Sequence, residues 1–448
     1  MTRRQAIASG LFAAVLSAAA CHRPAAASHA TPLSEVLPPP DACAIALAPG
    51  STRDATDREI SGAQAEGREG GARARNALER LGYLYVSRAR ITSDPGNYRL
   101  AEAAADCITS RFSDDPAALL LRGHVLDQLH RFHDAEQVAR ELTARRTMVL
   151  DYGLLGDALM EQGRLTEAAD AYQKMIDIKP FYQSYVRAAH MRWLEGDLKG
   201  AIAVMRLAIA SASPRDPESS AWAWTRMAAY QLQSGRLREA DDAAAAALTY
   251  EPEYAAAFLA QGRIRLARGD AAGAADVFAR AAKRNPVPEY QWAFADALRA
   301  CGRAREAESV ERELVARGGA ADPRTLAVYL ATRRTDVARA LALAEDELHT
   351  RADIFTLDAH AWTLAAAGRT TDALGEIRRA VSAGTQDARL FLHAGVINAA
   401  AGRNAEATRW LRRAERLRST LLPSEQAELD GRLTGSRSKR ELTSNEEN

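Results

Sequence analysis

The feature that most constrains the fold of this 448-residue chain is a short motif that recurs about every 33 residues. In Gly163–Ala168 and in six further copies, Gly-Arg or Gly-Asp precedes an acidic residue or a near equivalent, and then Ala. Two degenerate copies carry His130 and Thr335 in the Gly place. The terminal residues of the nine copies are Ala135, Ala168, Ala201, Ala240, Ala274, Ala307, Ala340, Ala373 and Ala407. Their spacings are 33, 33, 39, 34, 33, 33, 33 and 34.

Each residue of the motif has a structural reason. Gly takes the left-handed conformation that ends a helix, and Ala lets a following helix approach where a larger side chain would overpack. Proline residues such as Pro180 and Pro286 stop the second helix of a unit. Aromatic residues are only 6% of a chain that is 47% hydrophobic, which suits helices packed through small side chains. The pattern therefore predicts pairs of helices that stack one upon another.

This period resembles the roughly 34-residue tetratricopeptide repeat. Residues 78–418 also resemble a family of exported bacterial tetratricopeptide proteins, through Leu81-Gly82-Tyr83-Leu84-Tyr85 and Leu390-Phe391-Leu392-His393-Ala394-Gly395. The resemblance implies an all-α fold, a right-handed α-solenoid of about ten helical hairpins with a C-terminal capping helix. It implies protein binding and gives no specific activity, because this repeat serves many unrelated binding tasks.

The two ends of the chain differ from the repeats. Arg3 and Arg4 precede an uncharged, weakly apolar run, which predicts an export signal peptide at residues 1–30 that resembles a twin-arginine signal. Residues 31–71 are predicted as a disordered linker, 72–435 as the solenoid and 436–448 as a disordered tail. An alternative is lipidation at Cys21, which would tether the protein to a membrane.

The cysteines predict no disulfide framework. The chain has four, and cleavage after Ala30 would leave Cys43, Cys107 and Cys301, an odd number. Cys107 and Cys301 fall in helical patterns and are interpreted as small buried apolar residues.

Motifs of catalysis and nucleotide binding are missing from the sequence, which predicts a protein that is not an enzyme and uses no cofactor and no small-molecule substrate. The nearest approach to a metal cluster is His124, His130 and His133, but these flank a turn or lie on the preceding helix, so we predict no metal. A net charge of +1 argues against a nucleic-acid partner.

The resemblance places the first helix of each hairpin on a concave inner wall. Exposed aromatic and Arg side chains are the usual anchors of an interface. The inward polar and aromatic positions, taken as candidate protein-binding residues, are His124, Asp127, Asp157, Glu161, Arg187, His190, Trp193, Arg226, Arg263, Trp292, Asp296, Arg299 and Tyr329. Packing between neighbouring helices remains the alternative for each Trp, and plain solvation for each Arg.

The sequence as a whole predicts a non-enzymatic scaffold in the periplasm or cell envelope that binds a peptide or helix of an unidentified protein in its groove. The alternative is a membrane-anchored lipoprotein with a structural role in an envelope assembly or export complex.

Overall fold

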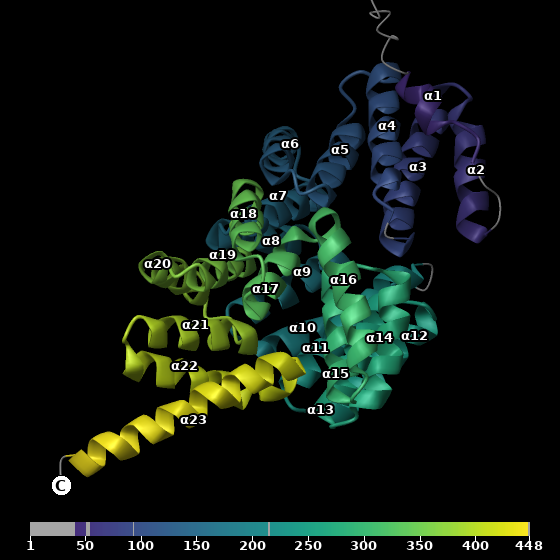
Figure 1. Cartoon of the computed structure of the whole chain (residues 1–448). Coiled ribbons are helices and arrows are strands. Elements are labelled where there is room, and N and C mark those ends of the chain that lie inside the picture. Colours follow the sequence, from purple (N-terminus) through teal and green to yellow (C-terminus); the bar gives the residue numbers. More distant parts are fainter. Residues whose placement is uncertain (1–40, 51–53, 93, 214–215, 447–448) are drawn as a thin grey trace, which may run out of the picture. The chain divides into compact units, whose positions relative to one another are not determined.

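Antiparallel helix pairs follow one another along the computed structural model (Figure 1), which describes residues 41–50, 54–92, 94–213 and 216–446. The predicted signal peptide and Cys21 lie outside these residues. Within them no strand is present, and no helix is long and apolar enough to cross a membrane.

Ten hairpins are present in the described part of the chain, as the repeat period predicts. The first helix of each is called its A helix and the second its B helix. The pairs are α3 (Gly71–Thr92) with α4 (Gly96–Arg111), α5 (Pro116–Gln128) with α6 (Phe132–Arg145), α7 (Val149–Glu161) with α8 (Leu165–Ile178), α9 (Tyr182–Leu194) with α10 (Leu198–Ala210), α11 (Pro217–Gln233) with α12 (Leu237–Tyr250), α13 (Ala255–Ala267) with α14 (Ala271–Arg284), α15 (Pro288–Ala300) with α16 (Ala304–Ala321), α17 (Pro323–Arg333) with α18 (Val337–Thr350), α19 (Ile354–Ala366) with α20 (Thr370–Val381), and α21 (Ala388–Ala400) with α22 (Asn404–Arg416).

The repeated motif occupies the turn between the A and B helices. All nine motif alanines are buried, and the turn glycines have φ between 73° and 85°, for example 75° at Gly163 and 76° at Gly235. His130 takes the same left-handed conformation with φ of 58°. In the other degenerate turn the positive φ falls on Arg334 and Asp336 and not on Thr335. The sequence therefore predicts the helix ends correctly at all but this turn.

The N-terminal region departs from the predicted linker. Residues 41–71 contain α1 (Ala42–Ala46) and α2 (Ala55–Gly67), and the prediction of disorder there is wrong. The side chains of Asp41 and Asp54 cap these helices by accepting backbone N–H groups. Helix α2 packs on α3 and buries Ile60 in the apolar cluster of the first hairpin, which orders the segment.

A disulfide joins Cys43 of α1 to Cys107 of α4, 64 residues later. The prediction that Cys107 is an unpaired apolar residue is therefore wrong, and only the remaining described cysteine, Cys301, is free. Parity misled the sequence argument, because an odd number of cysteines still allows one pair. The bond ties α1 to the first hairpin.

The C-terminal segment contains a short 3-10 turn, η1 (Arg418–Thr420), and helix α23 (Pro423–Glu446). Leu421, Leu422 and Leu429 are buried beneath the last hairpins, so this segment caps the core as predicted. The helix continues past residue 436, where the sequence predicts a disordered tail.

The close helix approach predicts a steric penalty at a motif alanine. Ala240→Leu in α12 should lower the free energy of unfolding by about 1–3 kcal/mol through overpacking. Ala245→Leu, at an exposed position of the same helix, is the matched control and should change it by less than about 0.5 kcal/mol. Urea unfolding measures both, and equal effects would contradict the packing assigned to Ala240.

The disulfide predicts a local effect on stability. Replacing Cys43 and Cys107 by Ser should destabilise α1–α4 by about 2–5 kcal/mol. Amide hydrogen exchange should become faster in these helices and stay unchanged in α13–α16, because repeats couple mainly to their neighbours. Unchanged protection of α1–α4 would show that the bond contributes nothing.

Candidate functional site

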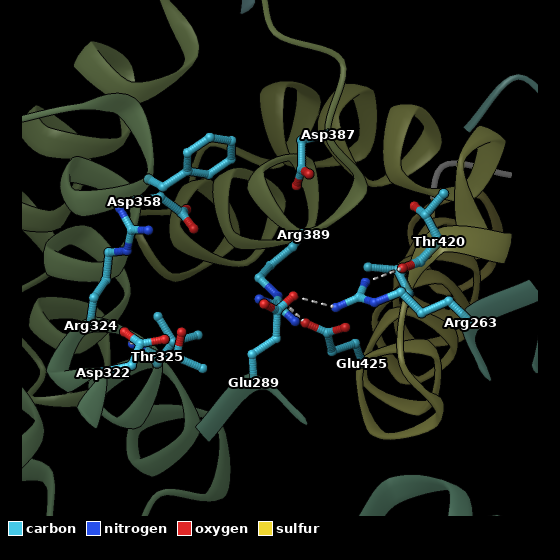
Figure 2. Close-up of a pocket in the computed structure, with 13 residues that line it drawn as sticks. Arg263, Glu289, Asp322, Arg324, Thr325, Asp358, Asp387, Arg389, Thr420 and Glu425 are labelled. Atoms are coloured by element: carbon cyan, nitrogen blue, oxygen red, sulfur yellow. Dashed lines mark hydrogen bonds and ion pairs between the residues drawn. The ribbon is translucent and has the colours of Figure 1, made fainter. Parts of the chain in front are cut away.

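A polar cavity of about 290 Å³ lies among the A helices of the C-terminal half, as Figure 2 shows. Helices α13, α15, α17, α19 and α21 supply its wall together with η1 and α23, and no B helix contributes. The lining residues are Arg263, Glu289, Asp322, Arg324, Thr325, Val328, Phe355, Asp358, Asp387, Arg389, Thr420, Leu421 and Glu425. The inner wall of the solenoid is therefore a charged surface in this region.

The three arginines of the cavity each have an acidic partner. Arg263 lies 3.1 Å from Glu289, and Arg389 donates to Glu425. Arg324 lies 3.1 Å from Asp353, the cap of α19. Such pairing offsets part of the cost of desolvating the guanidinium groups. It also orients these groups toward the cavity.

Two carboxylates of the wall have other roles. Asp358 is buried and lies 2.9 Å from Nδ1 of His393, which stacks on Trp362. Asp387 caps α21 by accepting the Leu390 N–H at 2.9 Å, and burial raises the pKa of Asp387. No side-chain cation lies within ion-pair distance of Asp387 in the described residues.

The C-terminal segment closes one side of the cavity. Ser424 donates its N–H and its hydroxyl to Asp296 of α15, at 3.0 and 2.5 Å, and Arg263 reaches the Thr420 carbonyl at 3.5 Å. Burial raises the pKa of Asp296 to about 6. Burial also acts to raise the pKa of Glu425, but Arg389 beside it holds that pKa below its usual value.

A second charged group lies on the A helices of the N-terminal half. Arg187 donates to both carboxylate oxygens of Asp157, at 2.8 and 2.5 Å, and the Tyr172 hydroxyl donates to the same carboxylate at 2.8 Å. Burial and the nearby carboxylates of Asp157 and Glu161 raise the pKa of Asp127 to about 8. One Asp127 oxygen is buried without a hydrogen-bond partner.

Aromatic and basic side chains continue this surface. His190 stacks on Trp193 of the same helix with ring centres 5.5 Å apart, and Arg226 lies over Trp193 at 5.5 Å. Burial, together with Arg226, lowers the pKa of His190 to about 3. His124 likewise has a pKa of about 3, because of burial and the charges of Arg90 and Arg187.

The residues predicted from sequence separate into three groups. The N-terminal charged group and its aromatic extension hold His124, Asp127, Asp157, Glu161, Arg187, His190, Trp193 and Arg226, all only partly accessible. Arg263 lines the cavity. Trp292, Asp296 and Tyr329 are buried, and Arg299 pairs with Glu311 of its own hairpin at 2.5 Å.

Trp292 illustrates the difference from the expected exposed anchor. It is 1% exposed, its ring meets Tyr329 edge-on at 5.5 Å, and Arg389 covers it at 4.8 Å. The packing alternative is therefore the observed one for this residue.

Arg263 is the lining residue that sequence reasoning identified, and the charged lining residues that it missed are Glu289, Asp322, Arg324, Asp358, Asp387, Arg389 and Glu425. Asp322 and Asp387 immediately precede helix starts and look like ordinary caps. Arg324 and Arg389, each the second residue of an A helix, were the available signal.

The raised pKa of Asp127 predicts a pH effect. Between the unfolded pKa of about 3.9 and the folded value, the folded protein retains a proton that the unfolded chain releases. The contribution of Asp127 to stability should therefore fall as pH rises through this window, by at most about 1.4 kcal/mol per pH unit. Asp127→Asn should reduce this fall and unfold at higher urea concentration than wild type at pH 8.5.

The matched control for that experiment is Asp170→Asn, at an exposed position of α8. Urea unfolding at pH 5 and pH 8.5 gives the comparison. If the free energies of unfolding of wild type and Asp127→Asn rose in parallel from pH 5 to pH 8.5, the raised pKa of Asp127 would be contradicted.

Comparisons with known proteins agree with this architecture. The family model described as tetratricopeptide repeat matches residues 120–183, 225–287 and 359–420. No curated protein matches the chain significantly.

Among solved structures, TTC0263, a thermophilic tetratricopeptide protein of Thermus thermophilus, is 22% identical over 41% of this chain and 99% of its own, with a TM-score of 0.34. An IFIT1 monomeric mutant with m7Gppp-AAAA is 13% identical over 81% of this chain and 85% of its own, with a TM-score of 0.46. YrrB, a tetratricopeptide protein with an unusual peptide-binding site, is 15% identical over 41% and 93%, with a TM-score of 0.30. From the matched repeats and the ten hairpins, the chain contains tetratricopeptide repeats and folds as an all-α solenoid of that type.

Proposed function

We propose that this protein is an exported, non-enzymatic scaffold that binds a peptide segment of a partner protein in the cavity between its A helices. Tetratricopeptide repeats generally serve as protein-interaction scaffolds. The observation that carries the proposal is the cavity itself, a space of about 290 Å³ whose wall displays charged side chains from five successive A helices.

The chemistry of the wall favours a peptide. Arg263, Arg324 and Arg389 have N–H groups that can donate to backbone carbonyls or carboxylates. The wall holds two more carboxylates than guanidinium groups, and Asp387 has no cationic partner among the described residues. This excess favours a peptide that brings a Lys or Arg side chain or an amino terminus. Phe355 and Val328 offer apolar contact beside these charges.

The disulfide supports export. Bonds such as Cys43–Cys107 persist in oxidising compartments and are rare in the cytosol. This agrees with the twin-arginine-like signal predicted at residues 1–30, and the periplasm or cell envelope is the proposed location.

The mature N-terminus distinguishes the soluble form from the membrane-anchored alternative. Mass spectrometry of the exported protein should find a chain that begins after Ala30. A diacylated Cys21 would instead support the lipoprotein with a structural role, for which Ala18-Ala19-Ala20-Cys21 is the motivating sequence.

Photo-crosslinking tests the site. With p-benzoylphenylalanine in place of Phe355, which lines the cavity, we expect an adduct with a peptide of one partner protein after irradiation in the native envelope. The matched control places the same residue at Tyr250, an exposed aromatic position on a B helix. Adducts only from position 250 would contradict the proposal.

A charge substitution tests which wall residues contribute. Arg263→Gln should reduce the adduct from position 355 about tenfold, as expected when about 1.4 kcal/mol of charged hydrogen bonding is lost. Arg268→Gln, at an exposed position one residue past the same helix, serves as the control and should leave the yield unchanged. Equal yields from both variants would remove Arg263 from the binding surface.

A further inference from the structure

Two loops of the C-terminal half contact hairpins that lie about 190 residues earlier in the sequence. The loop before α19 donates the Ala352 N–H to the Glu161 carbonyl at 3.0 Å. The loop before α21 donates the Thr385 hydroxyl to the Leu194 carbonyl. Figure 1 shows α19 beside α7 and α8, where Ile354 packs with them. We call this set of contacts, between residues 161–163 and 351–355 and between residues 193–196 and 383–386, the seam.

Apolar packing supports the first half of the seam. Ile354 is 5% exposed and belongs to the hydrophobic cluster of Leu126, Leu155 and Leu159 in the early hairpins. Phe355 stacks on Trp193 with ring centres 5.9 Å apart and planes 19° apart. The seam therefore contains buried apolar surface as well as hydrogen bonds.

Charged groups stand at the same place. Arg351 is 8% exposed, donates to Glu347 at 2.8 Å, and lies 3.7 Å from Glu161 and 3.9 Å from Asp353. Arg324 shares Asp353 from the other side. The ion pair between Arg351 and Glu161 is the one that crosses the seam.

The surroundings of the turn glycines show how closely the two sides of the seam approach each other. A Cβ atom added at Gly163 would lie 2.4 Å from the Ala352 carbonyl oxygen, and one at Gly196 would lie 2.6 Å from that of Gly384. Gly235 and Gly269 have the same left-handed backbone, with φ of 76° and 81°, and a Cβ there would meet nothing within 4 Å. Equivalent glycines of the repeat thus differ in one respect, whether another part of the chain covers them.

The seam adjoins the cavity. Phe355 belongs to both, since its ring stacks on Trp193 and also lines the cavity wall. Neighbouring repeats pack along whole helices, whereas the seam joins hairpins that are not neighbours through two loops and the first residues of α19. Solenoids are held mainly by nearest-neighbour contacts, and small contacts of this kind open at lower free energy than the core.

We propose that the seam is a gate: when it separates, Phe355 leaves Trp193 and the cavity wall opens at that side chain to admit a ligand, and when it closes the wall is complete again. With the seam closed, about 290 Å³ is room for a side chain or a chain end and not for a helix. In the closed state the cavity therefore admits only the end or an extended part of a peptide. Its role in binding rests on the proposed function, but its movement is measured without any ligand.

Hydrogen exchange at the seam is the direct test of its opening. In the full-length Gly163→Ala variant the Ala352 amide should exchange about tenfold faster than in Gly235→Ala, because the new methyl group pushes the Ala352 backbone away from the Glu161 carbonyl that accepts its N–H. The two variants carry the same left-handed strain, so the control removes general destabilisation. Equal exchange rates of the Ala352 amide in the two variants would show that the seam does not open separately from the rest of the fold.

Access to the cavity is the second measurement. Thr325→Cys in a Cys301→Ala background places one free thiol on the cavity wall of the described chain. A polyethylene-glycol maleimide should label it about tenfold faster when Gly163→Ala and Gly196→Ala are added than when Gly235→Ala and Gly269→Ala are added. Equal rates would refute the gate.

The two proposals fail separately. A seam-dependent labelling rate without any adduct from position 355 would leave the gate standing and reject peptide binding. An adduct with seam-independent labelling would do the reverse.

Discussion

The structure depends on how closely each B helix approaches its A helix at an alanine. The motif alanines are buried in all nine hairpins that carry the motif, so the same small side chain lies at the contact between the two helices. A repeated contact of this kind stacks successive hairpins in a similar way, and the A helices then share one face. The side chains on that face meet each other, which is why residues as distant as Arg263 and Glu425 line the same cavity.

The inner face carries charges that must be partnered because solvent reaches it poorly. Arg187 with Asp157, Arg389 with Glu425 and Arg324 with Asp353 are such pairs. Burying such an ion pair costs desolvation free energy, and the pairing fixes the orientation of the two side chains. Two carboxylates of the cavity wall, Asp322 and Asp387, have no side-chain cation within ion-pair distance among the described residues.

The repeat made most of the fold predictable. Helix ends, turn conformations and the ten hairpins follow from local residues that recur, and local signals are the strongest ones in a sequence. Helices α1 and α2 precede the repeat and share none of its periodicity, and the disulfide joins α1 to α4 of the first hairpin, so nothing in the register indicated them. The left-handed conformations of Arg334 and Asp336 were not predictable, because this turn has no glycine to mark it.

The candidate site was predicted less well, for a physical reason. The register predicts which residues face inward, but it does not predict what later covers them. Asp296 faces inward as expected, yet Ser424 covers it, and the early A helices meet loops about 190 residues further on. Such contacts depend on the rotation between successive repeats, added up over many of them. A small change in the rotation of each repeat would move the two contacting segments apart.

Hairpins that are distant in sequence touch across the seam and close the interior. Spin labels at Glu195 and Ser382, both exposed and at opposite sides of the seam, measure this by double electron–electron resonance on the full chain. A single narrow population at short distance is the predicted result. A broad or long distance distribution would mean that the repeats do not meet across the seam, and would contradict the account.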